Sequence, residues 1–300
     1  MQIKNKAYAA AIGANFIFGS SYAVVKYITP IFIHPLALNF VRVTVSIVLF
    51  WTLYLFKPGK TPINKKDLPR FLLCGLTGVT INQIFFIKGL SLTTAIHSSL
   101  LSLGTPIFIT IIAAWLLKEG FNAAKAAGLV FGIGGAALLI LMKDNSKTGS
   151  NMLLGDLLIL INAISYAFYL VLVRPLMAKY SGIQVLRWVF TIGAIGIIPF
   201  GLPHFLETNW IAFDTSHLIA LAYIAIAATF VAYLLTVYCI STIGSSATGA
   251  FIYTQPVFAA VIATIFAGEH FTLSKAIAAL LIFTGVYLVN FKKSSAVTEA

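Results

Sequence analysis

The chain has 300 residues, of which 60% are hydrophobic and 9% charged, with a formal net charge of +12. A typical soluble domain carries about 25% charged residues, so this composition excludes an ordinary soluble globular protein. The basic excess does not indicate nucleic-acid binding, because the Lys and Arg residues stand in short segments beside apolar runs and form no basic arm or patch. We expect no nucleic-acid partner.

Ten apolar stretches follow one another along the chain, each close to the roughly 20 residues that a helix needs to cross a bilayer. They are continuously apolar and lack the alternation typical of membrane strands, so we expect helices. The predicted spans are residues 7–28, 35–56, 69–90, 95–117, 123–142, 153–173, 183–203, 216–240, 245–267 and 273–291. The predicted fold class is an all-α membrane protein with ten transmembrane helices in a lipid bilayer.

The basic residues indicate orientation. With the N-terminus in the cytoplasm, ten spans place fourteen of the 20 Lys and Arg residues on the cytoplasmic side and six on the other. This asymmetry follows the positive-inside rule. The first apolar stretch is longer than the core of a signal peptide, so we take it as a span. We therefore predict a multi-pass protein of the inner (plasma) membrane with both termini in the cytoplasm.

The second half of the chain repeats the first. Residues 91–139 align without a gap on residues 241–289, at a constant offset of 150. The identical pairs include Pro106/Pro256, Glu119/Glu269 and Lys125/Lys275. We predict two units, residues 1–150 and 151–300, with five spans each. Because five is odd, the second unit starts on the opposite face, so the repeats are inverted, as in many secondary transporters.

Short motifs recur in a fixed order along the chain. They are Phe18-Gly19-Ser20-Ser21-Tyr22 with Lys26, the buried Arg42, Thr105-Pro106 with Glu119, and Gln255-Pro256 with Glu269. In this order and doubling the chain resembles the EamA-type transporters of the drug/metabolite transporter superfamily, over nearly its whole length. Phe18 and Tyr166 stand where that family usually has Trp. The resemblance implies transport, mostly export, of a small molecule, with cargo that differs among members: amino acids, purines, sugars, vitamins and other metabolites.

By the same resemblance, polar and aromatic side chains in spans one, three, four, six, eight and nine are the candidates for binding cargo in a central cavity. They are Asn15, Tyr22, Asn82, Gln83, Ser98, Ser102, Asn162, Tyr166, Tyr169, Tyr233, Tyr253 and Gln255. Asn, Gln and Ser also join helices in membranes, so we expect fewer than half of the candidates to contact cargo. Neutral donors and aromatic faces suit a small amphipathic or zwitterionic molecule. Cations on the outer side favour cargo with a carboxylate.

Three further residues are candidates for gating or for a structural role. Arg42 lies about seven residues into the second span, where a charge needs a partner or water. A carbonyl-bonded structural arginine and a role in substrate attraction or gating are equal alternatives. Pro106 and Pro256 fall inside the fourth and ninth spans, where each removes a backbone hydrogen bond. We expect paired kinks that shape a cavity or act as hinges, against a purely structural kink.

We expect the carboxylates to have mainly structural roles. Asp156 lies in the first turn of the sixth span, where the helix dipole favours an acid, and Glu119 and Glu269 suit cap or dipole roles. His97, near the outer start of the fourth span, is the nearest substitute for a proton carrier, and we expect a satisfied interfacial histidine. Without a carboxylate near mid-membrane, uncoupled or exchange-type export of small metabolites such as amino acids is favoured over proton-coupled multidrug efflux.

A membrane-embedded lipid-modifying enzyme is a remote alternative, because the five histidines are scattered singly without a paired acid motif. We expect no enzyme, no cofactor and no metal. Cys74 and Cys239 are expected to be small buried hydrophobes. Gly128 and Gly132 form a small-xxx-small pattern in the fifth span, which we expect to pack against another helix of the same chain. A monomer and a homodimer both remain open.

Overall fold

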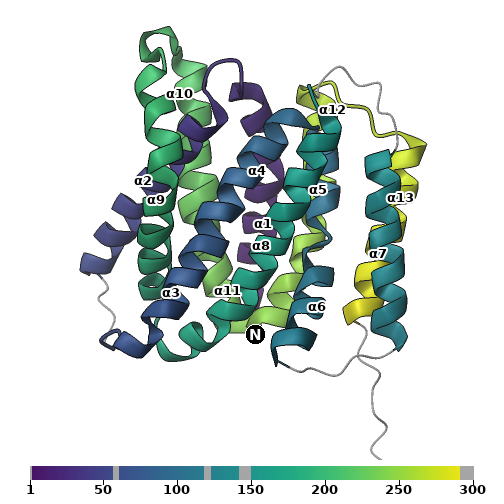
Figure 1. Ribbon diagram of the computed structural model, residues 1–300, viewed down its shortest axis with the longest axis horizontal. Coiled ribbons are helices and arrows are strands. Elements are labelled where there is room, and N and C mark those ends of the chain that lie inside the picture. Colours follow the sequence, from purple (N-terminus) through teal and green to yellow (C-terminus); the bar gives the residue numbers. More distant parts are fainter. Residues whose placement is uncertain (1, 57–60, 118–122, 142–149, 291–300) are drawn as a thin grey trace, which may run out of the picture.

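Helices make up the architecture. The computed structural model describes residues 2–56, 61–117, 123–141 and 150–290, and within these ranges it contains helices and no strands (Figure 1). The α-helices are α1 (Gln2–Ile28), α2 (Pro35–Phe56), α3 (Leu68–Gly75), α4 (Ile81–Leu92), α5 (Ala95–Ser102), α6 (Thr105–Leu117), α7 (Ala123–Leu141), α8 (Met152–Lys179), α9 (Gly182–Glu207), α10 (Thr215–Ala222), α11 (Ala232–Phe251), α12 (Gln255–Phe266) and α13 (Leu273–Asn290). The short turns η1 (Lys65–Asp67), η2 (Leu76–Thr80), η3 (Trp210–Ala212), η4 (Tyr223–Val231) and η5 (Ile252–Thr254) connect or interrupt them.

The helices have the length and apolarity of membrane spans. Eight helical stretches in the described ranges are long and apolar enough to cross a membrane. Two shorter apolar helices, Ile252–Phe266 and Leu273–Leu288, follow them and correspond to the last two predicted spans. The predicted all-α membrane fold is confirmed.

One predicted boundary is wrong. We predicted a loop between residues 240 and 245, but α11 runs through this segment to Phe251. In the first half, the matching break is fixed by Thr94, whose side chain accepts a hydrogen bond from the His97 N–H and so caps α5. The residue at the same position of the second repeat is Gly244. Because glycine offers no capping side chain and membrane helices tolerate it, the helix continues.

Both halves interrupt their helices at matching positions. The third span contains the π-helical turn η2, and residues 226–230, which match it at the offset of 150, lie within the π-helical turn η4. The fourth span breaks between α5 and α6, and the matching break is η5, before α12. Pro106 and Pro256 each occupy the second position of the helix after the break. The expected kink is therefore a full break, because the first turn is where a helix tolerates the missing N–H of proline.

The two halves pack against each other through reciprocal contacts. Helix α1 packs against η4, α11 and α12, whereas α8 packs against α3, α4, α5 and α6. Helices α7 and α13 form a separate pair at one edge of the bundle (Figure 1). There a Cβ atom on Gly285 would lie only 2.5 Å from the Gly132 nitrogen. The expectation that the glycine pattern of the fifth span packs within the chain is confirmed.

Candidate functional site

A polar cavity of about 150 Å³ lies between the halves. Most of its lining residues sit near the middle of the membrane-length helices, far from either end of the bundle. They are Asn15, Phe18, Ser21, Tyr22, Arg42, Asn82, Gln83, Phe86, Ser102, Thr105, Asn162, Tyr166, Ala228, Tyr233, Thr236, Ile252 and Gln255. Both helix breaks contribute to the wall, because Ser102 and Thr105 flank one break, and Ile252 and Gln255 flank the other.

Most of the candidate cargo residues come together in this cavity. The lining includes Asn15, Tyr22, Asn82, Gln83, Ser102, Asn162, Tyr166, Tyr233 and Gln255, together with Arg42. These side chains belong to seven of the ten predicted spans, so the fold gathers residues that are distant in sequence. Their contact with cargo stays a prediction.

Several amides of the cavity join helices. Asn162 Nδ2 donates to the Asn82 carbonyl oxygen at 2.8 Å, and Asn82 Nδ2 donates to the Asn162 carbonyl oxygen at 3.5 Å. This reciprocal pair connects α4 to α8. Gln255 Nε2 donates to Asn15 Oδ1 at 2.7 Å, which connects α12 to α1. These four residues therefore have the helix-joining role that amides often take in membranes, while each still faces the cavity.

Gln83 differs from the other amides. Its side chain is 2% exposed, and neither amide atom has a hydrogen-bond partner within the described residues. Tyr233 lines the same cavity. A buried polar group normally has a partner, so an amide without one is an exception in this wall.

Aromatic rings form the apolar part of the wall. Tyr22 packs edge-on against Phe86, with ring centroids 5.3 Å apart, and its hydroxyl donates to Ser102 Oγ at 3.2 Å. Phe18 packs edge-on against Tyr233 at 5.9 Å. The cavity thus combines ring faces with a few polar groups, as small-molecule sites commonly do.

Arg42 brings the positive charge to this wall. The residue is 7% exposed, and its Nε donates to Thr229 Oγ1 at 2.9 Å. Thr229 in turn donates to the Ile224 carbonyl oxygen at 2.8 Å, across the π-helical turn η4. No carboxylate forms an ion pair with Arg42 in the part of the chain that the structure describes.

Five candidates lie outside the cavity. Ser98 is fully buried in α5, and Tyr169 stacks behind Tyr166 at 5.7 Å, so the nearer ring covers it. Tyr253 packs on Phe283 of α13. Pro256 lines a separate apolar groove of about 480 Å³ beside α13, and Pro106 is absent from the polar cavity wall. Ser98, Tyr169 and Tyr253 therefore do not line the polar cavity in this conformation, and their contact with cargo stays a prediction.

The cavity also contains residues that were not among the candidates. They are Phe18, Ser21, Phe86, Thr105, Ala228, Thr236 and Ile252. Helical spacing is a signal that could have found some of them, because residues three or four apart share a helix face. Phe18 lies three residues after Asn15, and Thr236 lies three after Tyr233.

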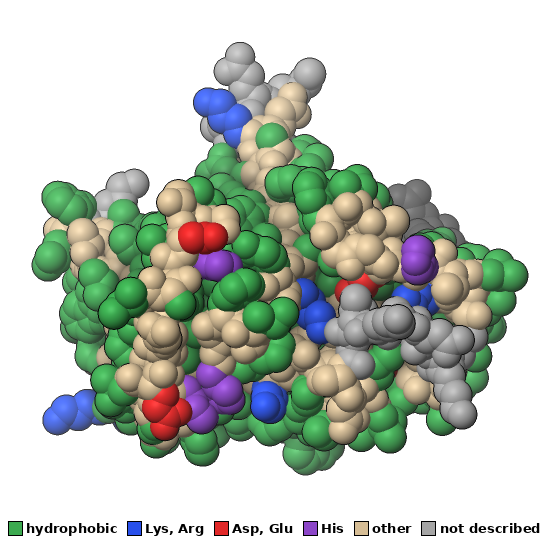
Figure 2. Space-filling view, turned by 90° about the horizontal axis from the view of Figure 1, so that it is seen from above, with side chains coloured by type: hydrophobic (Ala, Val, Ile, Leu, Met, Phe, Trp, Pro, Cys, Tyr) green, Lys and Arg blue, Asp and Glu red, His purple; other side chains and the backbone are tan. Residues whose placement is uncertain are grey.

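A second polar cluster lies at the upper end of the bundle in Figure 1, which Figure 2 shows from above with basic and acidic side chains close together near its middle. We call it the end network: Lys26, Thr93, Thr94, His97, Asp156 and Glu269. Its two acids, Asp156 and Glu269, are 1% and 0% exposed, so both carboxylates depend on protein partners.

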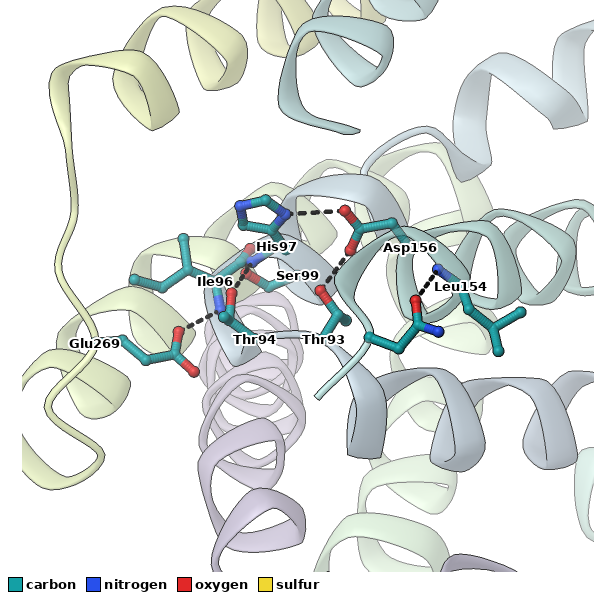
Figure 3. A network of polar contacts seen from close by, with 9 residues as sticks. Thr93, Thr94, Ile96, His97, Ser99, Leu154, Asp156 and Glu269 are labelled. Atoms are coloured by element: carbon teal, nitrogen blue, oxygen red, sulfur yellow. Dashed lines mark hydrogen bonds and ion pairs between the residues drawn. The ribbon is translucent and has the colours of Figure 1, made fainter. Parts of the chain in front are cut away.

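The carboxylates of the end network bind α5 and the turn before it (Figure 3). Glu269 accepts hydrogen bonds from the backbone N–H groups of Ala95 and Ile96, at 2.7 and 2.9 Å. Asp156 contacts His97 Nδ1 at 3.0 Å and accepts from the Thr93 hydroxyl. The cap role expected for Glu269 is confirmed, but it caps a helix of the other half, while Asp156 is held by side chains.

Lys26 completes the end network. Its Nζ donates to the Thr93 carbonyl oxygen at 2.7 Å. Lys26 therefore connects α1 to the turn between α4 and α5, and Glu269 connects the segment after α12 to the start of α5. In the described ranges, no group of three or more His, Cys, Asp or Glu residues is placed to hold a metal ion.

Membrane-length helices around a polar cavity at mid-depth define a multi-pass membrane transporter. The chain belongs to the EamA-like transporter family, which matches residues 5–141 and 153–291. Because the family and the relatives below are transporters, catalysis is not the expected activity.

Relatives in several kingdoms match most of the chain, and some of them carry transporter or exporter names. An uncharacterized transporter of Archaeoglobus fulgidus is 26% identical over 260 residues, which covers 86% of this chain and 89% of the relative. A WAT1-related protein of Arabidopsis thaliana is 26% identical over an alignment that covers 92% of this chain and 83% of the relative. A probable terminal-alkyne amino-acid exporter of Streptantibioticus cattleyicolor is 26% identical, with 75% and 74% covered. A crystal structure with a TM-score of 0.63 and 18% identity, covering 95% of this chain and 96% of that one, shares the fold.

Proposed function

We propose that the protein is a secondary transporter that exports or exchanges small metabolites, such as amino acids, by alternating access between two inverted halves, residues 1–150 and 151–300. The observation that carries the proposal is the polar cavity at mid-depth, whose wall contains residues of both halves. Transporters built from inverted repeats hold their substrate at this place.

The geometry of the halves supports the inversion. Helix α1, which opens the first half, and α8, which opens the second, run in opposite directions in Figure 1. The π-helical turns and the helix breaks recur at matching positions in both halves. Broken helices beside a cavity are a common feature of substrate sites in such transporters.

The end network supports alternating access. Through Lys26 and Glu269 it ties α1 and the segment after α12 to the turn before α5. We infer that these contacts close the upper end of the transport path in this conformation. Substrate would then enter and leave the cavity from the opposite end until the contacts break.

The distribution of charge supports an inner-membrane protein with cytoplasmic termini. Helix α1 begins and α13 ends at the lower side of Figure 1. Lys65, Lys66 and Arg70 lie at the start of the third span, and Lys179 at the end of the sixth, on this same side. Basic residues collect in the cytoplasm, so this end is assigned to the cytoplasmic face.

The size of the cavity favours metabolites over the alternative of proton-coupled multidrug efflux. A volume of about 150 Å³ is that of an engineered cavity that binds benzene, so it suits a cargo of few non-hydrogen atoms. The described lining also contains no Asp or Glu to exchange a proton for cargo. The amino-acid exporter among the relatives supports amino acids as the first class to test.

Flux through reconstituted vesicles tests the proposal. Vesicles loaded with a mixture of labelled amino acids should lose a subset of them only when the protein is present. Asn162→Leu, which places an apolar side chain in the cavity, should abolish this loss. Ile161→Leu, at a half-exposed neighbour outside the cavity, should leave it unchanged. Flux that requires an imposed proton gradient would overturn the uncoupled mode, and absence of any protein-dependent flux would overturn the transport proposal.

A further inference from the structure

We propose that Arg42 is the counter-ion of a carboxylate on the cargo, so that the transporter carries small carboxylates, including amino acids, and rejects their amides and amines. The inference rests on the proposed transport function and names the chemical group that the cavity selects.

The charge of the cavity wall is the first observation. Arg42 is the one side chain with a fixed charge among the described lining residues, and the wall contains no acid to neutralise it. A buried cation without an anion is costly in a membrane interior. A carboxylate on the cargo would supply the missing negative partner whenever the site is occupied.

The hydrogen bonds of Arg42 are the second observation. Its Nε is tethered to Thr229, and within the described ranges this is the hydrogen bond that the guanidinium makes. A guanidinium has five N–H donors, so the two Nη groups keep donors for a ligand. Planar pairs of such donors match the two oxygens of a carboxylate.

Gln83 is an independent observation that points to a ligand at the same place. Its side chain is 98% buried and faces the same cavity, yet both amide atoms lack partners in the described structure. Tyr233 and Arg42 line the same cavity as Gln83. Arg42, Tyr233 and Gln83 therefore all bring hydrogen-bond donors to the wall of one cavity.

A second buried arginine shows what a structural role looks like in this chain. The Arg187 guanidinium carbon lies 3.4 Å from the centre of the Tyr54 ring and 4.4 Å from that of Trp51. These ring faces stabilise a cation without an anion. Arg42 has no such ring over its guanidinium among the described residues, and it faces the cavity instead.

The same features limit the kind of anion. One positive charge balances one carboxylate, whereas a phosphate, with a charge near −2 at neutral pH, would leave a buried negative charge. The remaining wall offers ring faces at Phe18, Tyr22 and Phe86 for an apolar part. A small carboxylate with an apolar or aromatic side chain fits this combination best.

Paired compounds test the inference. Vesicles containing the wild-type protein are loaded with an equimolar mixture of leucine and phenylalanine, their amides, and the corresponding decarboxylated amines, and the compounds that leave are quantified by mass spectrometry. We expect the carboxylates to leave and the amides and amines to stay. In a thermal-shift titration of the purified protein, only the carboxylates should raise the unfolding temperature.

Three variants assign the selectivity to Arg42. Arg42→Gln should weaken carboxylate binding about tenfold or more, since a hydrogen bond to a charged group is lost. Arg42→Lys keeps the charge and should retain the preference for acids over amides at reduced affinity. Arg187→Gln, a buried arginine outside the cavity, is the matched control and should leave that preference unchanged.

Each possible result either supports or overturns the role proposed for Arg42. Export of amides or amines at the same rate as carboxylates would leave the transport function standing and overturn the role of Arg42. So would an Arg42→Gln protein that still prefers acids. If Arg42→Gln does not fold, the comparison of acids with amides in the wild-type protein and in Arg42→Lys still decides. If no compound leaves, the proposed transport function fails and the inference fails with it.

Discussion

Replacing Glu269 by Gln should open the upper end of the bundle. The carboxylate of Glu269 accepts hydrogen bonds from the first two N–H groups of α5, at 2.7 and 2.9 Å. A glutamine has one carbonyl oxygen, so it can satisfy one of these donors, while its NH₂ group faces the other. The variant is nearly isosteric and therefore tests the hydrogen bonds and the charge without creating a cavity.

The size of the effect follows from the contacts. A hydrogen bond to a charged group contributes about 1.5–3 kcal/mol, and a buried donor left without a partner costs a similar amount. We expect Glu269→Gln to destabilise the closed upper end by about 2–3 kcal/mol. This corresponds to a shift of about 30- to 150-fold in the equilibrium between closed and open upper ends.

Cysteine labelling measures this shift. The native Cys74 and Cys239 are buried and can be replaced, and a single cysteine is introduced at Ser21 in the cavity wall. A membrane-impermeant thiol reagent applied from the upper side should label Ser21→Cys slowly in the parent and many times faster when Glu269→Gln is added. Glu207→Gln, at an exposed acid near the same end, is the control and should leave the rate unchanged.

An unchanged labelling rate in folded Glu269→Gln protein would refute the reasoning. It would mean that Glu269 caps α5 as a static structural group and that the upper end closes by other contacts. Labelling that rises equally with Glu207→Gln would point to a general loosening of this face and would also count against a specific closure.

Two predictions concern stability. Gly285→Ala should separate α7 from α13 and lower the unfolding temperature, because its Cβ would lie 2.5 Å from the Gly132 backbone nitrogen, whereas Gly134→Ala, with nothing within 4 Å, should be neutral. Equal unfolding temperatures would contradict the close packing of this pair. Asp214 caps α10, and hydrogen bonds from the His217 N–H and the Ser216 hydroxyl hold the pKa of its carboxyl below the ordinary value. The stabilisation from the ionised Asp214 carboxylate is present above the unfolded pKa near 4 and is lost as the pH falls through the folded pKa. Asp214→Asn should therefore lower the stability of the protein at pH 7 and make that stability depend less on pH in the acid range. Thermal unfolding between about pH 2 and 7 measures both effects.

The sequence predicts the helices well because apolarity is a local property. Continuous apolar stretches define the membrane spans, and the polar residues within them mark most of the cavity wall. The error between residues 240 and 245 lies at the position where the first repeat has a break capped by Thr94. Gly244 stands at the matching position and offers no capping side chain. An alignment of the two repeats does not by itself show that this difference removes the break.

The end network illustrates what a linear reading misses. The sequence suggests that Glu269 caps a helix, but it does not show that this helix lies in the other half of the chain. Tertiary packing selects that partner, since Glu269 lies 174 residues from Ala95 and Glu119 is much closer in sequence. In the same way, helical spacing identifies Phe18 as a neighbour of Asn15, but only the fold shows that both face Arg42 in one cavity.

The contact between Glu269 and α5 also sets an order for biosynthesis. The acid follows the N–H group of Ala95 by 174 residues, so the ribosome must produce most of the second half before it appears. Until then, the start of α5 relies on Thr94 and on water for its open donors. A chain that stops after its first half therefore cannot complete this helix end, and the first half should remain a substrate for membrane quality control until the second half is inserted.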